Sequence, residues 1–300
     1  MTDIPHLGEW AALCTAFFWT ITAMAFESAS RKVGSLPVNW IRLGLAFLFL
    51  TVFCTIFRGK PLPLDAPPET WLWLSLSGLI GFTFGDLCLF QSYVVIGSRI
   101  AMLVMATVPP MTSLLGWAVL GETLSPMNIA GMALTLGGVA IVVLERKGNS
   151  DSKKFSHSLK GMALAFGGAF GQAVGLILSK LGLASGYSAF SATQIRIFVG
   201  LAGFSVLFFF LKTWPKVRMA LHHSHAMRRL SLGAFFGPFL GVSFSLLAVQ
   251  NTKTGIAATI MALVPVFIIA PAALVFKERV TIREVFGALI AVFGSVLLFI

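Results

Sequence analysis

Long apolar stretches separated by short polar segments run through the whole chain. A membrane's hydrocarbon core of about 30 Å requires about 20 apolar residues per crossing helix. Ten stretches meet this requirement: 9–29, 39–57, 71–92, 99–120, 126–144, 160–181, 189–211, 230–250, 254–276 and 281–300. The pattern predicts an all-α integral membrane protein with ten transmembrane helices. The longest linkers are at 145–159 and 212–229.

The second half of the chain repeats the first. Residues 100–109 align with 256–265 at an offset of 156 residues, so Met105 matches Met261 and Pro109 matches Pro265. Each half contains five predicted helices, an odd number, so the second half must enter the membrane from the opposite side. We therefore expect two inverted five-helix repeats, residues 1–145 and 146–300.

The composition excludes an ordinary soluble enzyme. The chain is 57% hydrophobic and 11% charged, whereas soluble domains are about 25% charged. The net charge of +11 lies in short loops between apolar spans, so we expect no nucleic-acid partner. The three cysteines all fall inside predicted spans and resemble neither a disulfide framework nor a metal cluster.

The basic residues are unequally divided between the two sides of the predicted bundle. The loops after helices 1, 3, 5, 7 and 9 contain most of them. The loops on the other side contain Arg58, Lys60, Lys180 and Lys253. Because basic loops are retained in the cytoplasm, this asymmetry predicts a multi-pass inner (plasma) membrane protein of the bacterial type with both termini outside the cytoplasm.

One motif resembles a known family. The segment Gly121-Glu122-Thr123-Leu124-Ser125-Pro126, followed by an apolar run with Gly131 and Gly138, resembles the end of an EamA repeat of the drug/metabolite transporter superfamily. The resemblance covers nearly the whole chain in two copies, although Lys277-Glu278-Arg279 replaces the Gly-Glu pair in the second. It implies ten helices around a central substrate cavity and transport of small metabolites. Many bacterial members export amino acids, including aromatic ones. Many relatives are drawn with cytoplasmic termini, contrary to the loop charges here.

Two matched prolines mark the best candidates for the site. Proline cannot donate a hydrogen bond to the carbonyl four residues earlier. Pro109 therefore leaves the carbonyl of Met105 without a helical donor, and Pro265 does the same for Met261. Such breaks are tolerated where they line a cavity or are satisfied by neighbours. We interpret them as bend points beside the substrate site; simple helix curvature is the alternative.

Asp86 is the carboxylate deepest inside a predicted span. An unpaired charge at that depth is costly, so Asp86 should face a partner or a water-filled cavity. Two interpretations stay open: a proton-coupling or substrate-binding group, or an ion pair with Arg42 or Arg196. The two arginines are repeat partners near helix ends, and we interpret them as structural charges.

Glu27 and Lys180 end helices 1 and 6 at matched positions. They are candidate gates at opposite faces, or ordinary interfacial charges. The full set of candidate cavity residues combines the matched pairs with nearby aromatic and polar positions: Trp19, Phe82, Asp86, Met105, Pro109, Gln172, Ser243, Met261 and Pro265.

The motifs that the sequence lacks limit the classes of function that it can have. A Walker A loop, a metalloprotease motif and a serine-hydrolase motif are absent from the sequence. The triad His222, His223 and His225 is interpreted as a solvated loop, so neither a metal nor a cofactor is expected.

We expect a secondary transporter, not an enzyme, that exports neutral or zwitterionic metabolites by alternating access. Amino acids are the leading substrates, lipophilic drugs the alternative, and a channel or scaffold a remote one. A small molecule and the lipid bilayer are the expected partners, and no oligomer is required.

Overall fold

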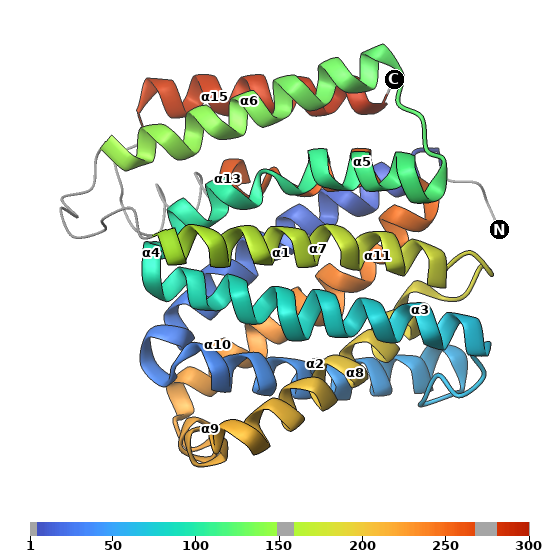
Figure 1. The fold of residues 1–300 in the computed structure, drawn as a ribbon, viewed down its shortest axis with the longest axis vertical. Coiled ribbons are helices and arrows are strands. Elements are labelled where there is room, and N and C mark those ends of the chain that lie inside the picture. The colour runs from blue at the N-terminus through green and yellow to red at the C-terminus, as the bar shows by residue number, and fades with distance from the viewer. Residues whose placement is uncertain (1–4, 149–158, 268–280, 300) are drawn as a thin grey trace.

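The structure is a computed structural model that describes residues 5–148, 159–267 and 281–299. The described residues form helices without strands, most of them aligned in one bundle (Figure 1). The first half contains α1 (Leu7–Val33), α2 (Ser35–Arg58), α3 (Pro68–Gly78), η1 (Leu79–Asp86), α4 (Leu87–Met105), α5 (Val108–Leu120) and α6 (Pro126–Gly148). The second contains α7 (Leu159–Gly182), α8 (Ala189–Leu211), α9 (Trp214–Leu221), α10 (Ser224–Ala234), η2 (Phe235–Gly241), α11 (Val242–Asn251), α12 (Thr254–Met261), α13 (Val264–Phe267), α15 (Ile282–Val296) and η3 (Leu297–Phe299).

Many of these helices are long and apolar enough to cross a membrane. Six qualify by length and composition: Leu7–Ser30, Ser35–Arg58, Pro68–Ile96, Leu159–Gly182, Ala189–Leu211 and Ser224–Asn251. Shorter apolar helices cover Val108–Leu120, Pro126–Ile141 and Val285–Val296. The protein is therefore a multi-pass membrane protein, while the count of ten crossings stays a prediction.

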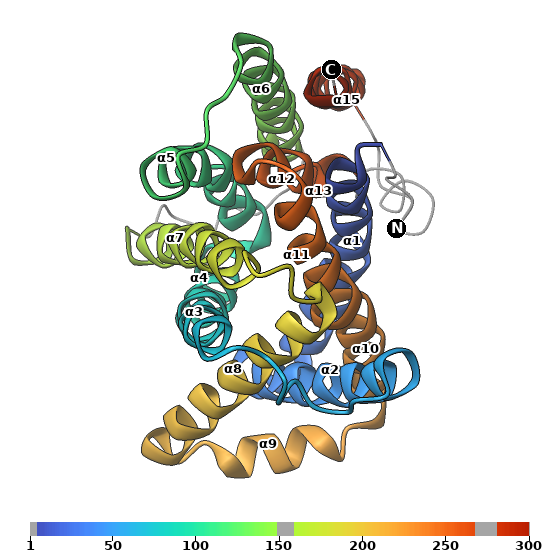
Figure 2. The ribbon, with the colours of Figure 1, turned by 90° about the vertical axis from the view of Figure 1, so that its right-hand side faces the viewer.

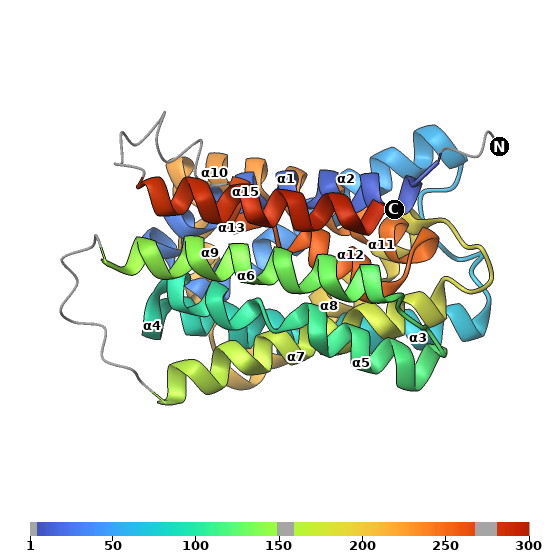
Figure 3. The same cartoon turned by 90° about the horizontal axis from the view of Figure 1, so that it is seen from above.

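The helices that end the two repeats, α6 and α15, run antiparallel and side by side (Figure 3). A Cβ added to Gly138 would lie 2.5 Å from the carbonyl oxygen of Gly287, and one added to Gly294 would lie 2.8 Å from that of Gly131. Gly131 matches Gly287 in the repeat, and Gly138 matches Gly294. The contact therefore maps onto itself when the repeats are exchanged, as a two-fold relation between inverted halves requires.

Each repeat packs its third span on the first span of the other repeat. In the first half, η1 and α4 contact α7, and in the second half η2 and α11 contact α1 (Figure 2). Glycines make both approaches close, because small residues let helix backbones approach one another. A Cβ added to Gly171 of α7 would lie 2.6 Å from the Cα of Gly85, and one added to Gly241 would lie 2.6 Å from the Trp19 indole nitrogen. The two halves are thus interlocked.

The third span of each repeat contains a π-helical segment at a matched position. The first, η1, begins at Leu79, and the second, η2, begins at Phe235, which is 156 residues later. A π-helix is rare, and in other proteins it often occurs at functional sites. The hydrophobic pattern did not predict these segments, although their glycines stand out in the repeat alignment.

The fourth span of each repeat is broken just before its matched proline. The helix stops at Met105 and resumes at Val108 in the first half, and it stops at Met261 and resumes at Val264 in the second. Pro109 has no N–H to donate at the first break, and the same holds for Pro265 at the second. The interruptions thus occur where the sequence predicts bends.

The bundle has two distinct ends. We call the end where α1 begins and α15 ends the terminal face, and the other end the α9 face (Figure 1). The segment 212–229, expected to be a linker, contains α9 and the start of α10. The short helix α9 lies across the bundle, crosswise to α3 and α7 (Figure 2). Its eight residues are too few to appear in a search for 20-residue spans.

Candidate substrate cavity

A mostly apolar cavity of about 190 Å³ lies between the two repeats. Its walls come mainly from the first, third and fourth spans of each repeat, including η1, both broken helices and Pro238 of η2. Arg42 of the second span and Val139 of the fifth complete them. Seven of the nine cavity residues predicted from the sequence line it: Trp19, Phe82, Asp86, Met105, Pro109, Gln172 and Met261.

Two other predicted cavity residues have different positions. Ser243 is buried outside the cavity, where its hydroxyl donates to the carbonyl of Phe239 at 2.6 Å. Its neighbour Val242 lines the wall in its place, which corrects the expectation for Ser243. The backbone of Pro265 lies in α13, next to the lining residue Val264, and its side chain is outside the described part of the structure.

The charged part of the cavity wall is an ion pair between Arg42 and Asp86. Arg42 is 6% exposed, and its Nε also donates to Asn39 Oδ1 at 3.0 Å. Its guanidinium carbon lies 4.7 Å from the ring centroid of Phe90 and 5.5 Å from that of Phe26. Arg42 therefore does not extend toward an interface, as a snorkelling side chain would. Of the two interpretations of Asp86, the structure contains the ion pair.

The repeat partner of Arg42 has a different environment. Arg196 is 3% exposed, and its guanidinium lies 4.9 Å from the ring centroid of Phe82. Its Nε and Nη1 have no hydrogen-bond partner among the described residues. Arg196 is absent from the cavity wall, but the ring of Phe82 that it contacts lines that wall. Matched positions in the sequence thus give one paired and one incompletely bonded arginine.

A polar cluster joins the two repeats at the terminal face. Lys180, at the end of α7, donates to Glu122 Oε1 at 2.6 Å and to the carbonyl of Thr252 at 2.7 Å. Glu122 Oε2 accepts from the backbone N–H and the hydroxyl of Thr254 at 2.8 and 2.7 Å. The hydroxyl of Thr252 donates to Glu9 at 2.6 Å. Glu122 therefore supplies a charged acceptor at the beginning of α12, where helical N–H groups lack partners.

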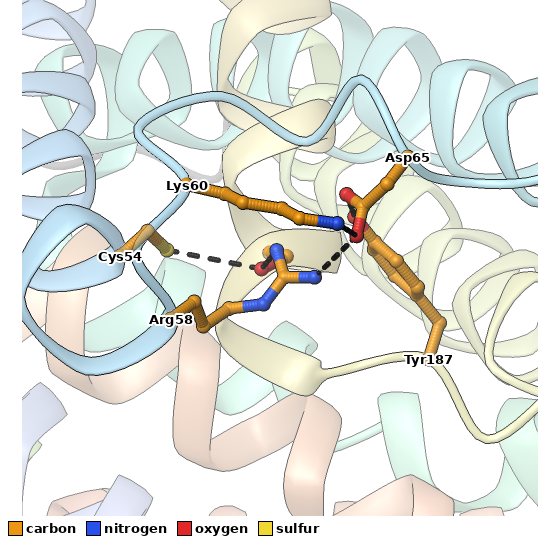
Figure 4. A network of polar contacts seen from close by, with 6 residues as sticks. Cys54, Arg58, Lys60, Asp65 and Tyr187 are labelled. Atoms are coloured by element: carbon orange, nitrogen blue, oxygen red, sulfur yellow. Dashed lines mark hydrogen bonds and ion pairs between the residues drawn. The ribbon is translucent and has the colours of Figure 1, made fainter.

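A second network ties two loops together at the same face (Figure 4). Asp65 accepts from Arg58 at 2.8 Å, from Lys60 at 3.0 Å and from the Tyr187 hydroxyl at 3.0 Å. The hydrogen bond from Lys60, with help from Tyr187 and Arg58, lowers the pKa of the Asp65 carboxyl to about 2. Burial raises the pKa of the Tyr187 hydroxyl. Arg58 also donates to Ser191 at 2.5 Å, so α2 is tied to α8.

The two candidate gates are not equally described. Lys180 lies in the cluster at the terminal face, whereas the side chain of Glu27 lies outside the described part. All of Glu278, the repeat partner of Glu122, also lies outside it. The three histidines are exposed: His222 and His223 lie between α9 and α10, and His225 lies in the first turn of α10. The part of the chain that the structure describes contains no group of three metal-ligating side chains.

Sequence reasoning missed three aromatic residues that line the cavity: Phe26, Phe90 and Tyr93. With 28 phenylalanines in the chain, a single one carries little signal. Arg42 could have indicated these rings, because a cation in an apolar span requires partners. Aromatic rings can supply them. The Lys180–Glu122 pair was missed because its members lie in different repeats.

Two interlocked helical repeats of opposite orientation around a shared cavity define a membrane transporter built from inverted repeats. The model of the EamA-like transporter family matches residues 6–144 and again 159–300. The chain therefore belongs to the EamA-like transporter family, which confirms the resemblance in the sequence.

Solved structures show the same fold. One, titled "Crystal structure of protein", superposes with a TM-score of 0.72 over 98% of this chain and 96% of that chain. Its 15% sequence identity shows the fold alone. No curated protein matches the sequence.

Proposed function

We propose that this protein is a secondary transporter that exports small neutral or zwitterionic metabolites, foremost amino acids, including aromatic ones. The observation that carries the proposal is the cavity between the repeats, with one ion pair in an aromatic wall. Arg42 offers a cation for a carboxylate, and Asp86 offers an anion for an ammonium group. The rings of Phe82, Phe90 and Trp19 suit an apolar side chain.

The size and charge of the cavity favour small solutes. Its volume of about 190 Å³ is below the roughly 300–1,000 Å³ of drug-sized pockets. A phosphorylated substrate would require several cations in the wall, but Arg42 is the lining residue that carries a positive charge, and Asp86 balances it. Efflux of lipophilic compounds by the same mechanism is the second candidate, since the wall is mostly apolar.

Alternating access would use the two breaks and the two faces. The helix interruptions at Met105 and Met261 give each repeat a flexible point beside the cavity. At the terminal face, Lys180 and Thr254 of the second repeat both contact Glu122 of the first. We propose Lys180 as a gate residue that must leave Glu122 when the cavity opens on that side. Glu27, its repeat partner, is the proposed gate of the other face.

Asp86 is the proposed proton-coupling group. A proton on Asp86 would weaken its attraction to Arg42, so one event would change both the charge of the cavity and the position of the arginine. The loop charges support an inner-membrane protein with the α9 face in the cytoplasm.

Transport into proteoliposomes tests the proposal. Purified protein should move labelled amino acids, with leucine and phenylalanine as first probes, and Asp86→Asn should abolish the response to an imposed pH gradient. Glu69→Gln, which neutralises an exposed carboxylate at the start of α3, is the matched control and should respond like the wild type. Failure of a full amino-acid panel, with transport of lipophilic cations intact, would favour the second candidate. An unchanged pH response in Asp86→Asn would refute the coupling role.

A further inference from the structure

The connection between α8 and α10 forms a groove with the first turns of α2 at the α9 face. The groove has a volume of about 450 Å³ and is lined by Trp40, Trp214, Pro215, Val217, Arg218 and Leu221. Trp40 lies near the start of α2 and the other lining residues are in α9. This groove shares no lining residue with the cavity between the repeats.

The helix α9 has the geometry of a segment that lies in the membrane plane. It runs crosswise to the spanning helices (Figure 2). Val217 and Ala220 are buried against the bundle, whereas Met219 is 74% exposed. A short helix with an apolar face and basic residues is typical of the boundary between headgroups and acyl chains.

Two tryptophans indicate the level at which the groove lies in the membrane. The rings of Trp40 and Trp214 meet edge to face with centroids 5.3 Å apart. The indole N–H of Trp40 donates to the Ser205 hydroxyl at 2.9 Å, which holds the ring in place. Tryptophan is enriched at the level of lipid headgroups, so both rings indicate that the groove opens at the interface.

The charged residues of the segment around the groove are all basic. Residues 212–229 contain Lys212, Lys216, Arg218, Arg228 and Arg229 and no acidic residue. The first four are exposed and form no ion pair within the described residues. Arg229, in contrast, bonds to Ser28. Unpaired basic residues next to an apolar groove complement a negatively charged headgroup joined to acyl chains.

We propose that this groove is a binding site for an anionic phospholipid, whose acyl chain lies against Trp40 and Trp214 and whose phosphate contacts Arg218 and Lys216. The lipid holds α9 in the membrane plane and thereby fixes the connection between α8 and α10. This site is independent of the proposed transport function.

Tryptophan quenching by brominated lipids tests the site. The full chain is placed in phosphatidylcholine nanodiscs, and brominated phosphatidylglycerol or brominated phosphatidylcholine is added in increasing fraction. The anionic lipid should reach half-maximal quenching at a lower fraction than the neutral one. Trp214→Phe should lose part of the high-affinity quenching, because it removes one of the two reporters in the groove.

Arg218→Gln should weaken binding of the anionic lipid about five-fold, the typical effect of one basic residue near an anionic surface. Lys160→Gln removes an equal charge from the exposed start of α7 and should leave the half-point unchanged. Equal half-points for the two lipids, or equal shifts in the two variants, would overturn the proposal. Full competition by free glycerol phosphate would also overturn it, because the site would then recognise an anion without its acyl chains.

Discussion

The two π-helical segments have the same place in their repeats but different chemistry. Both lie in the third span, and both have a glycine packed on the first span of the other repeat. The first, η1, ends at Asp86, which forms an ion pair with Arg42. The matched residue after η2 is Val242, which lines the same cavity without a charge. The duplicated backbone thus provides the frame, and single-copy side chains provide the chemistry.

The matched arginines extend this comparison. Arg42 has Asp86, Asn39 and two aromatic rings as partners. Arg196 is at least as buried, yet two of its nitrogens lack hydrogen bonds within the described residues. Two arginines at matched sequence positions therefore have different partners. Substituting each of them separately tests this difference.

The largest effect is expected for Arg42→Met. Removing one member of a buried ion pair costs about 3–5 kcal/mol because the other charge stays buried without a partner. Arg196→Met should cost much less, since Arg196 has no comparable partner to abandon. Thermal unfolding of the purified variants in detergent measures both changes.

The double variant Arg42→Met/Asp86→Leu is the control for this prediction. Replacing a whole buried pair by apolar residues is often neutral or stabilising, so the double variant should be more stable than Arg42→Met alone. If Arg42→Met and Arg196→Met lower the melting temperature equally, the asymmetry between the repeats does not hold.

Next in size is the effect of Lys180→Met on the terminal face. A hydrogen bond to a charged group contributes about 1.5–3 kcal/mol. Lys180 makes two such bonds at this face, one of them to Glu122 of the other repeat. Their loss should raise the open population about ten-fold or more, since 1.4 kcal/mol corresponds to a factor of ten. A Met105→Cys reporter, in a variant with the three native cysteines replaced by serine, should react faster with a charged thiol reagent added at that face.

Lys253→Met is the matched control, because Lys253 lies at the same face without a described ion pair. It should leave the labelling rate of the reporter unchanged. Equal rates in Lys180→Met and the unsubstituted reporter protein would show that Lys180 is not part of the gate.

The sequence predicted features of the fold that recur in both repeats, but few of the contacts between residues far apart in the chain. Matched prolines predicted the breaks before Pro109 and Pro265 because a missing N–H has a local and unavoidable effect. The π-segments went unpredicted, since one extra residue in a helical turn hardly alters an apolar pattern. The helix α9 was likewise missed because a short amphipathic segment between charges resembles a loop.

For the cavity, the sequence predicted which residues lie deep in the membrane better than it predicted the direction of their side chains. Asp86 was recognised because a carboxylate in an apolar span is rare, and Arg42 followed as a candidate partner. Ser243 does not line the cavity because the side-chain direction in a helix changes by about 100° per residue. Its neighbour Val242, the repeat partner of Asp86, has the direction that faces the cavity.

The two glycine contacts of the π-segments should respond differently to an added methyl group. Gly171→Ala would place a Cβ against the backbone of Gly85, and such overpacking costs about 1–3 kcal/mol. Gly241→Ala meets the Trp19 side chain first, which can rotate at the expense of the cavity wall. We expect Gly171→Ala to lower the melting temperature more, and Gly241→Ala to change substrate affinity more. The reverse order in either assay would contradict the proposed packing difference.

The smallest effect is expected at Asp65, in the loop network of the terminal face. Its pKa is lowered from 3.8 to about 2, chiefly by the hydrogen bond from Lys60. A carboxyl whose folded-state pKa is depressed stabilises the fold above its ordinary pKa and loses that contribution as the pH falls through the depressed value. The network should therefore stay intact from neutral pH to about pH 4 and weaken as the pH approaches 2.

Asp65→Asn should accordingly lower stability by less than about 1 kcal/mol, because exposed ion pairs contribute little. Melting temperatures of the wild type and the variant should differ by a constant amount at neutral and mildly acidic pH and converge as the pH nears 2. A gap that already closes between neutral pH and pH 5 would mean that Asp65 titrates in the physiological range. In that case a pH response of transport would no longer point to Asp86 alone, and the contrast between η1 and η2 would lose its functional meaning.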